Sequence, residues 1–167
     1  AELGYLMADA QRHAAKADIA LVNPGGIRLN YLAKGPITLM HVYKLDPFGN
    51  ELILTRLTGH EIHNLMLAAF PVDENLPLYP SGIRTKLKLD AEGNLTELVL
   101  LTETNTPLDL DQTYTVAMNN YMTQVYKYEH SDPGQSLYME TADAIISYLK
   151  KDKQLRSYRG ETRIQME

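Results

Sequence analysis

The amino-acid sequence predicts a single α+β domain in which helices pack on a mixed β-sheet. Length is the first reason, because 167 residues can bury one independent hydrophobic core and rarely two. The second is an alternation between helix-like segments with a periodic apolar stripe and short strand-like runs that stop at proline or glycine. The third is a composition typical of globular domains, 44% hydrophobic and 22% charged, without repeats, linkers or low-complexity tracts.

The first half of the chain is predicted to hold two helices and two strands before a third helix. In order, these are helix 3–16, strand 18–22, helix 39–45 and strand 51–57. Thr58 is expected to open the third helix, because Glu61 three residues later completes a capping box. Phe70-Pro71 is expected to end this helix at about residue 69, since proline and the residue before it disfavour the α conformation.

The second half is predicted to be richer in strands. In order, we expect strand 84–90, strand 95–102, strand 113–118 and helix 141–151, with an edge strand in the tail 159–166. The turn at 91–94 joins the first two strands in a hairpin. Residues 71–80 contain three prolines and are predicted to form a loop, and the polar, Tyr-rich segment 119–135 indicates no clear element.

Composition disfavours several classes of function. The absence of cysteine excludes disulfides, thiolate metal sites and a cysteine nucleophile. A net charge of −5 argues against binding to a nucleic-acid duplex, and no apolar run is long enough for a membrane span. Because the chain begins Ala1-Glu2 without a methionine or a leader, we expect it to have been processed or cut from a longer protein.

The first candidate functional segment runs from Asn23 to Arg28, with the sequence Asn-Pro-Gly-Gly-Ile-Arg, after the strand predicted at 18–22. Gly25 and Gly26 allow the backbone to approach a ligand closely. Arg28 carries a planar fork of donors that matches phosphate or carboxylate, and Asn23 offers a donor and an acceptor. The alternative is a plain turn with a surface arginine, which the spacing alone favours.

The second candidate is Phe48, in the turn Asp-Pro-Phe-Gly-Asn at 46–50. The chain has only two phenylalanines, and this one lies between proline and glycine rather than in a periodic segment. A rigid turn can present a ring on which a nucleobase stacks. The alternative is that Phe48 fills the core beneath the loop.

The third candidate is Asn119-Asn120-Tyr121 at the end of a predicted strand, where these side chains could line a pocket. The tyrosines that follow, at 126 and 128, fit equally well with a helix that packs its rings on the core. His60 and His63 are spaced i, i+3 rather than the i, i+4 of zinc hydrolases, so we expect them to have a structural or surface role. We predict no metal ligand and no catalytic residue in this chain.

Seven short motifs occur in the order found in one family, which the chain resembles over nearly its whole length. They lie at 3–10, 17–28, 35–38, 46–50, 57–62, 81–84 and 113–119. The chain is similar to the C-terminal domain of the 5′-nucleotidase, UDP-sugar hydrolase and 2′,3′-cyclic phosphodiesterase family. The resemblance implies that 1–167 is one substrate-binding domain and that catalysis belongs to a separate metallophosphoesterase domain absent from this chain.

The same resemblance implies cofactors, partners and location. A pair of divalent metals is expected on the N-terminal metallophosphoesterase domain, in cis or in trans, and no cofactor in this chain, which alone is expected to be inactive. The small-molecule partner is expected to be a nucleotide or nucleoside, in keeping with nucleotide catabolism. Family members are mostly periplasmic, secreted or attached to the cell surface, so a similar location is expected here.

Matching motifs also imply roles for individual residues. Arg28 stands where the family has a phosphate-binding arginine, and Asn23 where a loop asparagine reaches the scissile phosphate region. Phe48 stands where the first of two base-sandwiching aromatic rings is expected, and Tyr121 where the second is expected. The implied substrate-binding residues are Asn23, Gly25, Gly26, Arg28, Phe48, Asn120 and Tyr121.

Two departures from the family pattern leave an alternative open. The family usually has Gly-Asn where this chain has Gly4-Tyr5, so a pocket-side amide is missing. A Gly-Gly-Asp-Gly loop usually follows the second aromatic, whereas here the segment 122–134 is longer and different. The alternative function is therefore a non-catalytic binding or interaction module descended from the substrate-binding domain.

Overall fold

The computed structural model describes residues 1–167 and contains five α-helices, eight β-strands and one short 3₁₀ turn. The helices are α1 (Glu2–Ala15), α2 (Leu39–Leu45), α3 (Gly59–Val72), α4 (Asn120–Val125) and α5 (Thr141–Lys151). The strands are β1 (Ile19–Val22), β2 (Glu51–Thr58), β3 (Tyr79–Ser81), β4 (Ile83–Leu89), β5 (Leu95–Thr102), β6 (Thr113–Asn119), β7 (Gln135–Glu140) and β8 (Ile164–Met166). The 3₁₀ turn η1 covers Pro24–Gly26.

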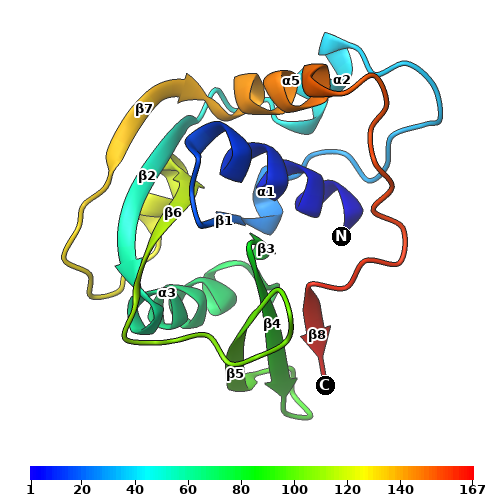
Figure 1. Ribbon diagram of the computed structural model, residues 1–167. Coiled ribbons are helices and arrows are strands. Elements are labelled where there is room, and N and C mark those ends of the chain that lie inside the picture. The colour runs from blue at the N-terminus through cyan, green and yellow to red at the C-terminus, as the bar shows by residue number, and fades with distance from the viewer.

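Two sheets organise the molecule (Figure 1). The larger is mixed, with strand order β3-β1-β6-β2-β7, and β1 runs parallel to β6 while the other pairs are antiparallel. The smaller has the order β5-β4-β8, with β8 parallel to β4 at its edge. The α+β class with helices packed on a mixed sheet is confirmed, and the second sheet is an addition to that prediction.

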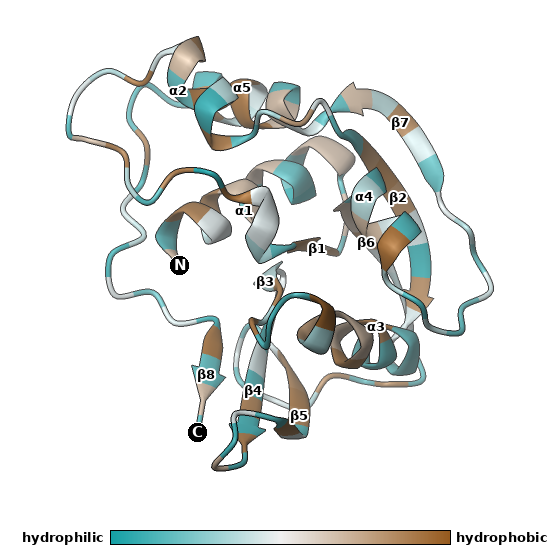
Figure 2. Cartoon of the chain, turned by 180° about the vertical axis from the view of Figure 1, so that it is seen from behind, coloured by the Kyte–Doolittle hydropathy of each residue, from teal (hydrophilic) through white to brown (hydrophobic).

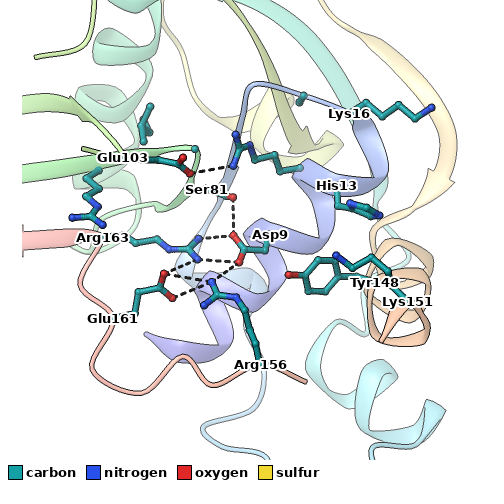
Figure 3. Close-up of a pocket in the computed structure, with 15 residues that line it drawn as sticks. Asp9, His13, Lys16, Ser81, Glu103, Tyr148, Lys151, Arg156, Glu161 and Arg163 are labelled. Carbon is teal, nitrogen blue, oxygen red and sulfur yellow. Dashed lines mark hydrogen bonds and ion pairs between the residues drawn. The ribbon is translucent and has the colours of Figure 1, made fainter. Parts of the chain in front are cut away.

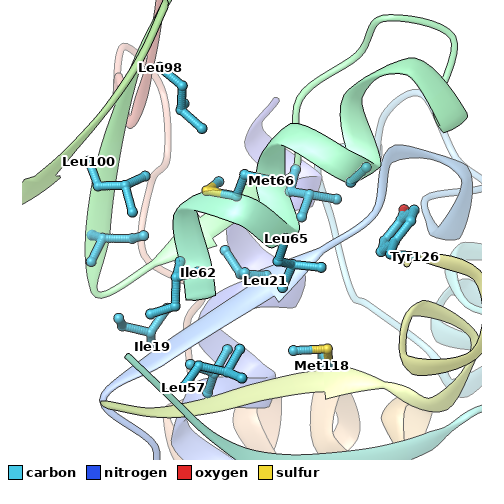
Figure 4. Packing of buried hydrophobic residues seen from close by; sticks show 14 of the residues in the cluster. Ile19, Leu21, Leu57, Ile62, Leu65, Met66, Leu98, Leu100, Met118 and Tyr126 are labelled. Carbon is cyan, nitrogen blue, oxygen red and sulfur yellow. The ribbon is translucent and has the colours of Figure 1, made fainter. Parts of the chain in front are cut away.

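The four residues of β1 divide the core between the two faces of the larger sheet. Ile19 and Leu21 pack with α3, β4 and β5 on one face, in the cluster shown in Figure 4. Ala20 and Val22 belong to clusters with α1, α2 and α5 on the other face. Because alternate residues of a strand point to opposite faces, a strand that is buried throughout is covered on both sides.

Most predicted elements of the first half are confirmed, including α1, α2, β2 and the capping box of Thr58 and Glu61 at the start of α3. The predicted end of α3 at Phe70-Pro71 is wrong, because α3 continues to Val72. Phe70 is almost fully buried, so core packing favours the helical conformation there. Pro71 lies in the exposed last turn, where the backbone hydrogen bond that proline cannot donate is lost at the surface.

Two strands, β3 and β7, were not predicted from the sequence. The end of the predicted loop 71–80 is wrong, because Tyr79 and Pro80 belong to β3. Pro80 is tolerated there because β3 is an edge strand of the larger sheet. At the opposite edge, β7 pairs with β2 through a bulge, and only part of its length is shielded from solvent. The hydropathy colouring of Figure 2 shows why β1 and β2 were easier to predict, since both are rich in hydrophobic residues.

In the second half, β4, β5, β6, α5 and the edge strand β8 are confirmed, with boundary shifts of one residue in β4 and β6 and a shorter β8. No helix of the structure combines the length and the hydrophobicity that crossing a bilayer would require.

Candidate functional site

The strand pairing of the larger sheet brings three chain segments together at one edge, the edge formed by the ends of β1 and β6 and the start of β2. β1 runs parallel to β6, with Ala20 opposite Ala117, so the segments that follow both strands leave at the same end. β2 runs antiparallel to β6, with Leu52 opposite Asn119, so the loop before β2 reaches that end as well. The predicted site residues lie on these three segments, although no two of the segments are adjacent in sequence.

The loop after β1 is held by a buried pair of amides. Asn119 Nδ2 donates a hydrogen bond of 2.9 Å to Asn23 Oδ1, and both side chains are about 4% exposed. Asn23 Nδ2 donates no hydrogen bond within the chain, so it is available to a ligand. A Cβ atom at Gly26 would lie 3.0 Å from Asn23 Oδ1, so glycine there leaves room for this arrangement, whereas Gly25 is exposed.

Arg28 and Phe48 lie together at this edge. The guanidinium carbon of Arg28 is 5.9 Å from the centroid of the Phe48 ring, within the range of a cation–π contact. The backbone N–H of Arg28 donates to the carbonyl of Leu45 (3.0 Å), at the end of α2, which fastens the two loops to each other. Phe48 is 51% exposed, so the alternative in which it fills the core is wrong.

The helix α4 follows β6 directly, and its first turn carries the remaining predicted residues, Asn120 and Tyr121. Asn119 caps this helix by accepting a hydrogen bond from the N–H of Met122 (2.9 Å). Asn120 Oδ1 accepts from the N–H of Glu51 (2.9 Å), so this oxygen ties α4 to β2. Tyr121 is 43% exposed at the surface of α4.

Asp46 and Thr141 belong to this edge but were not singled out from the sequence. Both side chains are buried, and the Thr141 hydroxyl donates to the Asp46 carboxylate. Burial raises the pKa of Asp46, although the hydroxyl of Thr141 and the backbone of Phe48 partly offset that effect. The only sequence signal was a carboxylate next to a proline turn, which also occurs in ordinary exposed turns.

The tyrosines of the segment 122–134 divide between two roles. Tyr126 is buried in the core and its hydroxyl donates to Asp73. Tyr128 stacks on His130 with ring centroids 4.4 Å apart, and burial, followed by the charge of Glu61, raises the pKa of Tyr128 to about 12. Both tyrosines therefore serve the packing of this segment, in contrast to the exposed Tyr121.

The histidines of α3 have identifiable contacts of their own. A ring nitrogen of His63 is 2.8 Å from the carbonyl oxygen of Leu98, which joins α3 to β5. His60 is exposed and lies 3.3 Å from the carboxylate of Asp111. The contact of His63 supports the structural role expected for it.

An ionic cleft of about 830 Å³ lies at the other end of β1, next to Ala17 (Figure 3). Its central carboxylate, that of Asp9, accepts hydrogen bonds from Ser81, Arg156, Tyr158 and Arg163. Arg156 and Arg163 also pair with Glu161. Because these arginines are already paired within the chain, we assign the cleft a structural role, which is to fasten the C-terminal segment to α1.

Comparison with known proteins now places the chain in a family. A sequence model of the "5'-nucleotidase, C-terminal domain" matches residues 1–126. The chain belongs to the family of 5′-nucleotidase C-terminal domains. The crystal structure of a 5′-nucleotidase precursor from Thermus thermophilus has the same fold, with a TM-score of 0.83 and 32% identity over 99% of this chain.

Two curated relatives of the 5′-nucleotidase C-terminal domain illustrate how much longer the related proteins are. Endonuclease YhcR of Bacillus subtilis is 31% identical over 98% of this chain, which spans 14% of that protein. The cell wall protein Lmo0130 of Listeria monocytogenes is 32% identical over 72% of this chain, which spans 17% of that protein. The chain likewise spans 35% of the Thermus chain.

The family match covers all of the predicted site residues and ends at residue 126, within the segment that departs from the family pattern. The other departure, Tyr5, has a structural explanation. The Tyr5 ring is buried beneath the guanidinium of Arg163 (4.9 Å), and its hydroxyl accepts the backbone N–H of Arg163 (3.2 Å). In this 5′-nucleotidase C-terminal domain, the position therefore anchors the tail next to the ionic cleft.

Proposed function

We propose that this chain is the nucleotide-recognition domain of a 5′-nucleotidase-like phosphoesterase. The observation that carries the proposal is the position of Arg28 beside the half-exposed Phe48 ring, 5.9 Å from guanidinium carbon to ring centroid. A guanidinium binds phosphate through charge-assisted hydrogen bonds, and an exposed ring stacks on a nucleobase. A nucleoside monophosphate carries both groups in one molecule.

Other residues at the same edge suit this ligand. The Nδ2 group of Asn23 can donate to a phosphate oxygen, while its Oδ1 accepts from Asn119 and holds the side chain in place. Gly25 and Gly26, in the turn η1, have no side chains, so a ligand can approach the backbone there closely. Tyr121 offers a second aromatic surface on the first turn of α4. Arg28 would stabilise the negative charge that develops during phosphoryl transfer.

Hydrolysis is assigned to another domain or chain. The family implies a pair of divalent metals, but this chain contains no group of three or more His, Asp or Glu side chains placed to hold a metal ion. The residues present do not fit such a centre, and we derive no catalytic step from it. We propose an N-terminal metallophosphoesterase domain, in cis or in trans, as the partner, and a periplasmic, secreted or cell-surface location.

Replacing Phe48 with alanine tests the proposal. Loss of one base-stacking ring is expected to weaken binding of adenosine monophosphate about tenfold, since such stacking contributes roughly 1–3 kcal/mol. Isothermal titration calorimetry of the 167-residue chain measures this affinity.

Leu67→Ala is the matched control, because it removes a partly exposed apolar side chain from α3, which begins at the far end of β2 from Phe48. The control should bind the nucleotide as the native chain does. Equal affinities of the Phe48→Ala and native chains would contradict the proposed role of Phe48.

A further inference from the structure

The turn that carries Phe48 is fastened at both ends to one residue, the first of α5. The Thr141 hydroxyl donates to Asp46 Oδ2, at the start of the turn. The Thr141 backbone N–H donates to the carbonyl of Asn50, at the end of the turn (2.8 Å). Because Thr141 is 2% exposed, its side chain has one fixed environment, and α5 and the turn behave as one unit.

The attachment of the turn to α5 depends on the Thr141 hydroxyl, because the Asp46 carboxylate that accepts its hydrogen bond is buried. Asp46 is 3% exposed, and a buried carboxylate is stable only where hydrogen-bond donors surround it. The groups that stabilise its charge are the Thr141 hydroxyl and the backbone of Phe48 itself. Removing the hydroxyl would leave Asp46 short of a donor and would loosen the start of the turn, which it ties to α5.

The phosphate half of the proposed site is held by different contacts. The Arg28 backbone is bonded to Leu45, and Asn23 to Asn119, and neither contact involves Thr141. The two halves can therefore be separated experimentally, even though they lie side by side.

We propose that Thr141 and Asp46 form a clasp that positions Phe48 and thereby sets recognition of the nucleoside, while phosphate recognition is independent of it. This inference rests on the proposed function. Thr141 is a positioning residue, because the two hydrogen bonds that it donates are to Asp46 and Asn50, at the two ends of the turn. Through its hydroxyl, the first turn of α5 fixes the position of Phe48 and so affects which nucleoside the site binds.

Thr141→Val and Thr141→Ser together test the clasp by calorimetry. Valine keeps the shape and the backbone bond to Asn50 but lacks the hydroxyl, so adenosine and adenosine monophosphate should bind about fivefold more weakly. Serine keeps the hydroxyl and should restore native affinity. Inorganic phosphate should bind all three chains equally. Unchanged adenosine binding by Thr141→Val, or equal loss in both variants, would refute the clasp.

A measurement without ligand separates failure of the clasp from failure of the proposed function. Hydrogen exchange of the Asp46 backbone N–H, which donates to the Val42 carbonyl (2.9 Å) at the start of the turn, can be followed by NMR. It should be about tenfold faster in Thr141→Val than in the native and Thr141→Ser chains. Exchange rates outside the turn and thermal unfolding report whether the fold is intact. Unchanged exchange in Thr141→Val overturns the clasp. Faster exchange in Thr141→Val, together with a native chain that does not bind adenosine, overturns the nucleotide site alone.

Discussion

Replacing Asp9 with asparagine is expected to lower the free energy of unfolding by about 3–5 kcal/mol at neutral pH, because it leaves the buried Arg163 without its main charge partner. Arg163 donates to both Asp9 oxygens, at 2.6 and 2.9 Å, and its side chain is 9% exposed. The effect should be visible in urea denaturation. Glu129→Gln, which neutralises an exposed acid, is the control and should change stability by only a few tenths of a kcal/mol.

The ion pair of Asp9 and Arg163 also predicts that the stability of the chain depends on pH. Burial alone would raise the pKa of Asp9, but hydrogen bonds from Arg163, Ser81 and Tyr158 outweigh it and lower the pKa to about 2. Because the folded-state pKa lies below the unfolded value, this stabilisation is complete above about pH 4 and is lost as the pH falls toward 2. The stability difference between the native and Asp9→Asn chains should therefore narrow across that range. A difference that stays constant would show that Asp9 is not the titrating group.

Replacing Arg28 with alanine is expected to weaken binding of adenosine monophosphate by about tenfold to a hundredfold, since hydrogen bonds to charged groups contribute roughly 1.5–3 kcal/mol. Adenosine lacks the phosphate, so its affinity should change little. This pattern differs from that expected for Phe48→Ala, which should weaken the binding of both adenosine monophosphate and adenosine. Calorimetric titrations with the two ligands measure the difference directly.

Arg56→Ala provides the control for charge, because it removes an exposed arginine from β2. Arg56 lies opposite Thr115, toward the end of β6 that is far from Asn119 and the proposed site. The Arg56→Ala chain should retain native affinity for both ligands. Equal weakening by Arg28→Ala and Arg56→Ala would indicate that only net charge matters. A native affinity of Arg28→Ala would remove Arg28 from the site.

Local signals in the sequence were sufficient for much of the fold. The capping box of Thr58 and Glu61 and the apolar stripe of α5 depend only on residues a few positions apart, and both are confirmed. The edge strands β3 and β7 were missed because their strand conformation depends on neighbours distant in sequence. Neither has the continuous apolar run that made β1 predictable.

In the candidate site, too, local features could be predicted and contacts between distant residues could not. Glycines near Arg28 and a proline-flanked Phe48 were visible in the sequence, but their proximity depends on the order of strands in the larger sheet. The bond between Asn23 and Asn119 and the clasp of Asp46 and Thr141 join residues about a hundred positions apart. No local pattern predicts such pairs, because either partner alone is compatible with an ordinary polar turn.

A crystal structure of the chain with adenosine monophosphate bound would test the central claim most directly. We predict the phosphate within hydrogen-bond distance of the Arg28 guanidinium and the adenine ring stacked on Phe48. A nucleotide bound elsewhere, for example in the ionic cleft around Asp9 at the other end of β1, would contradict the account.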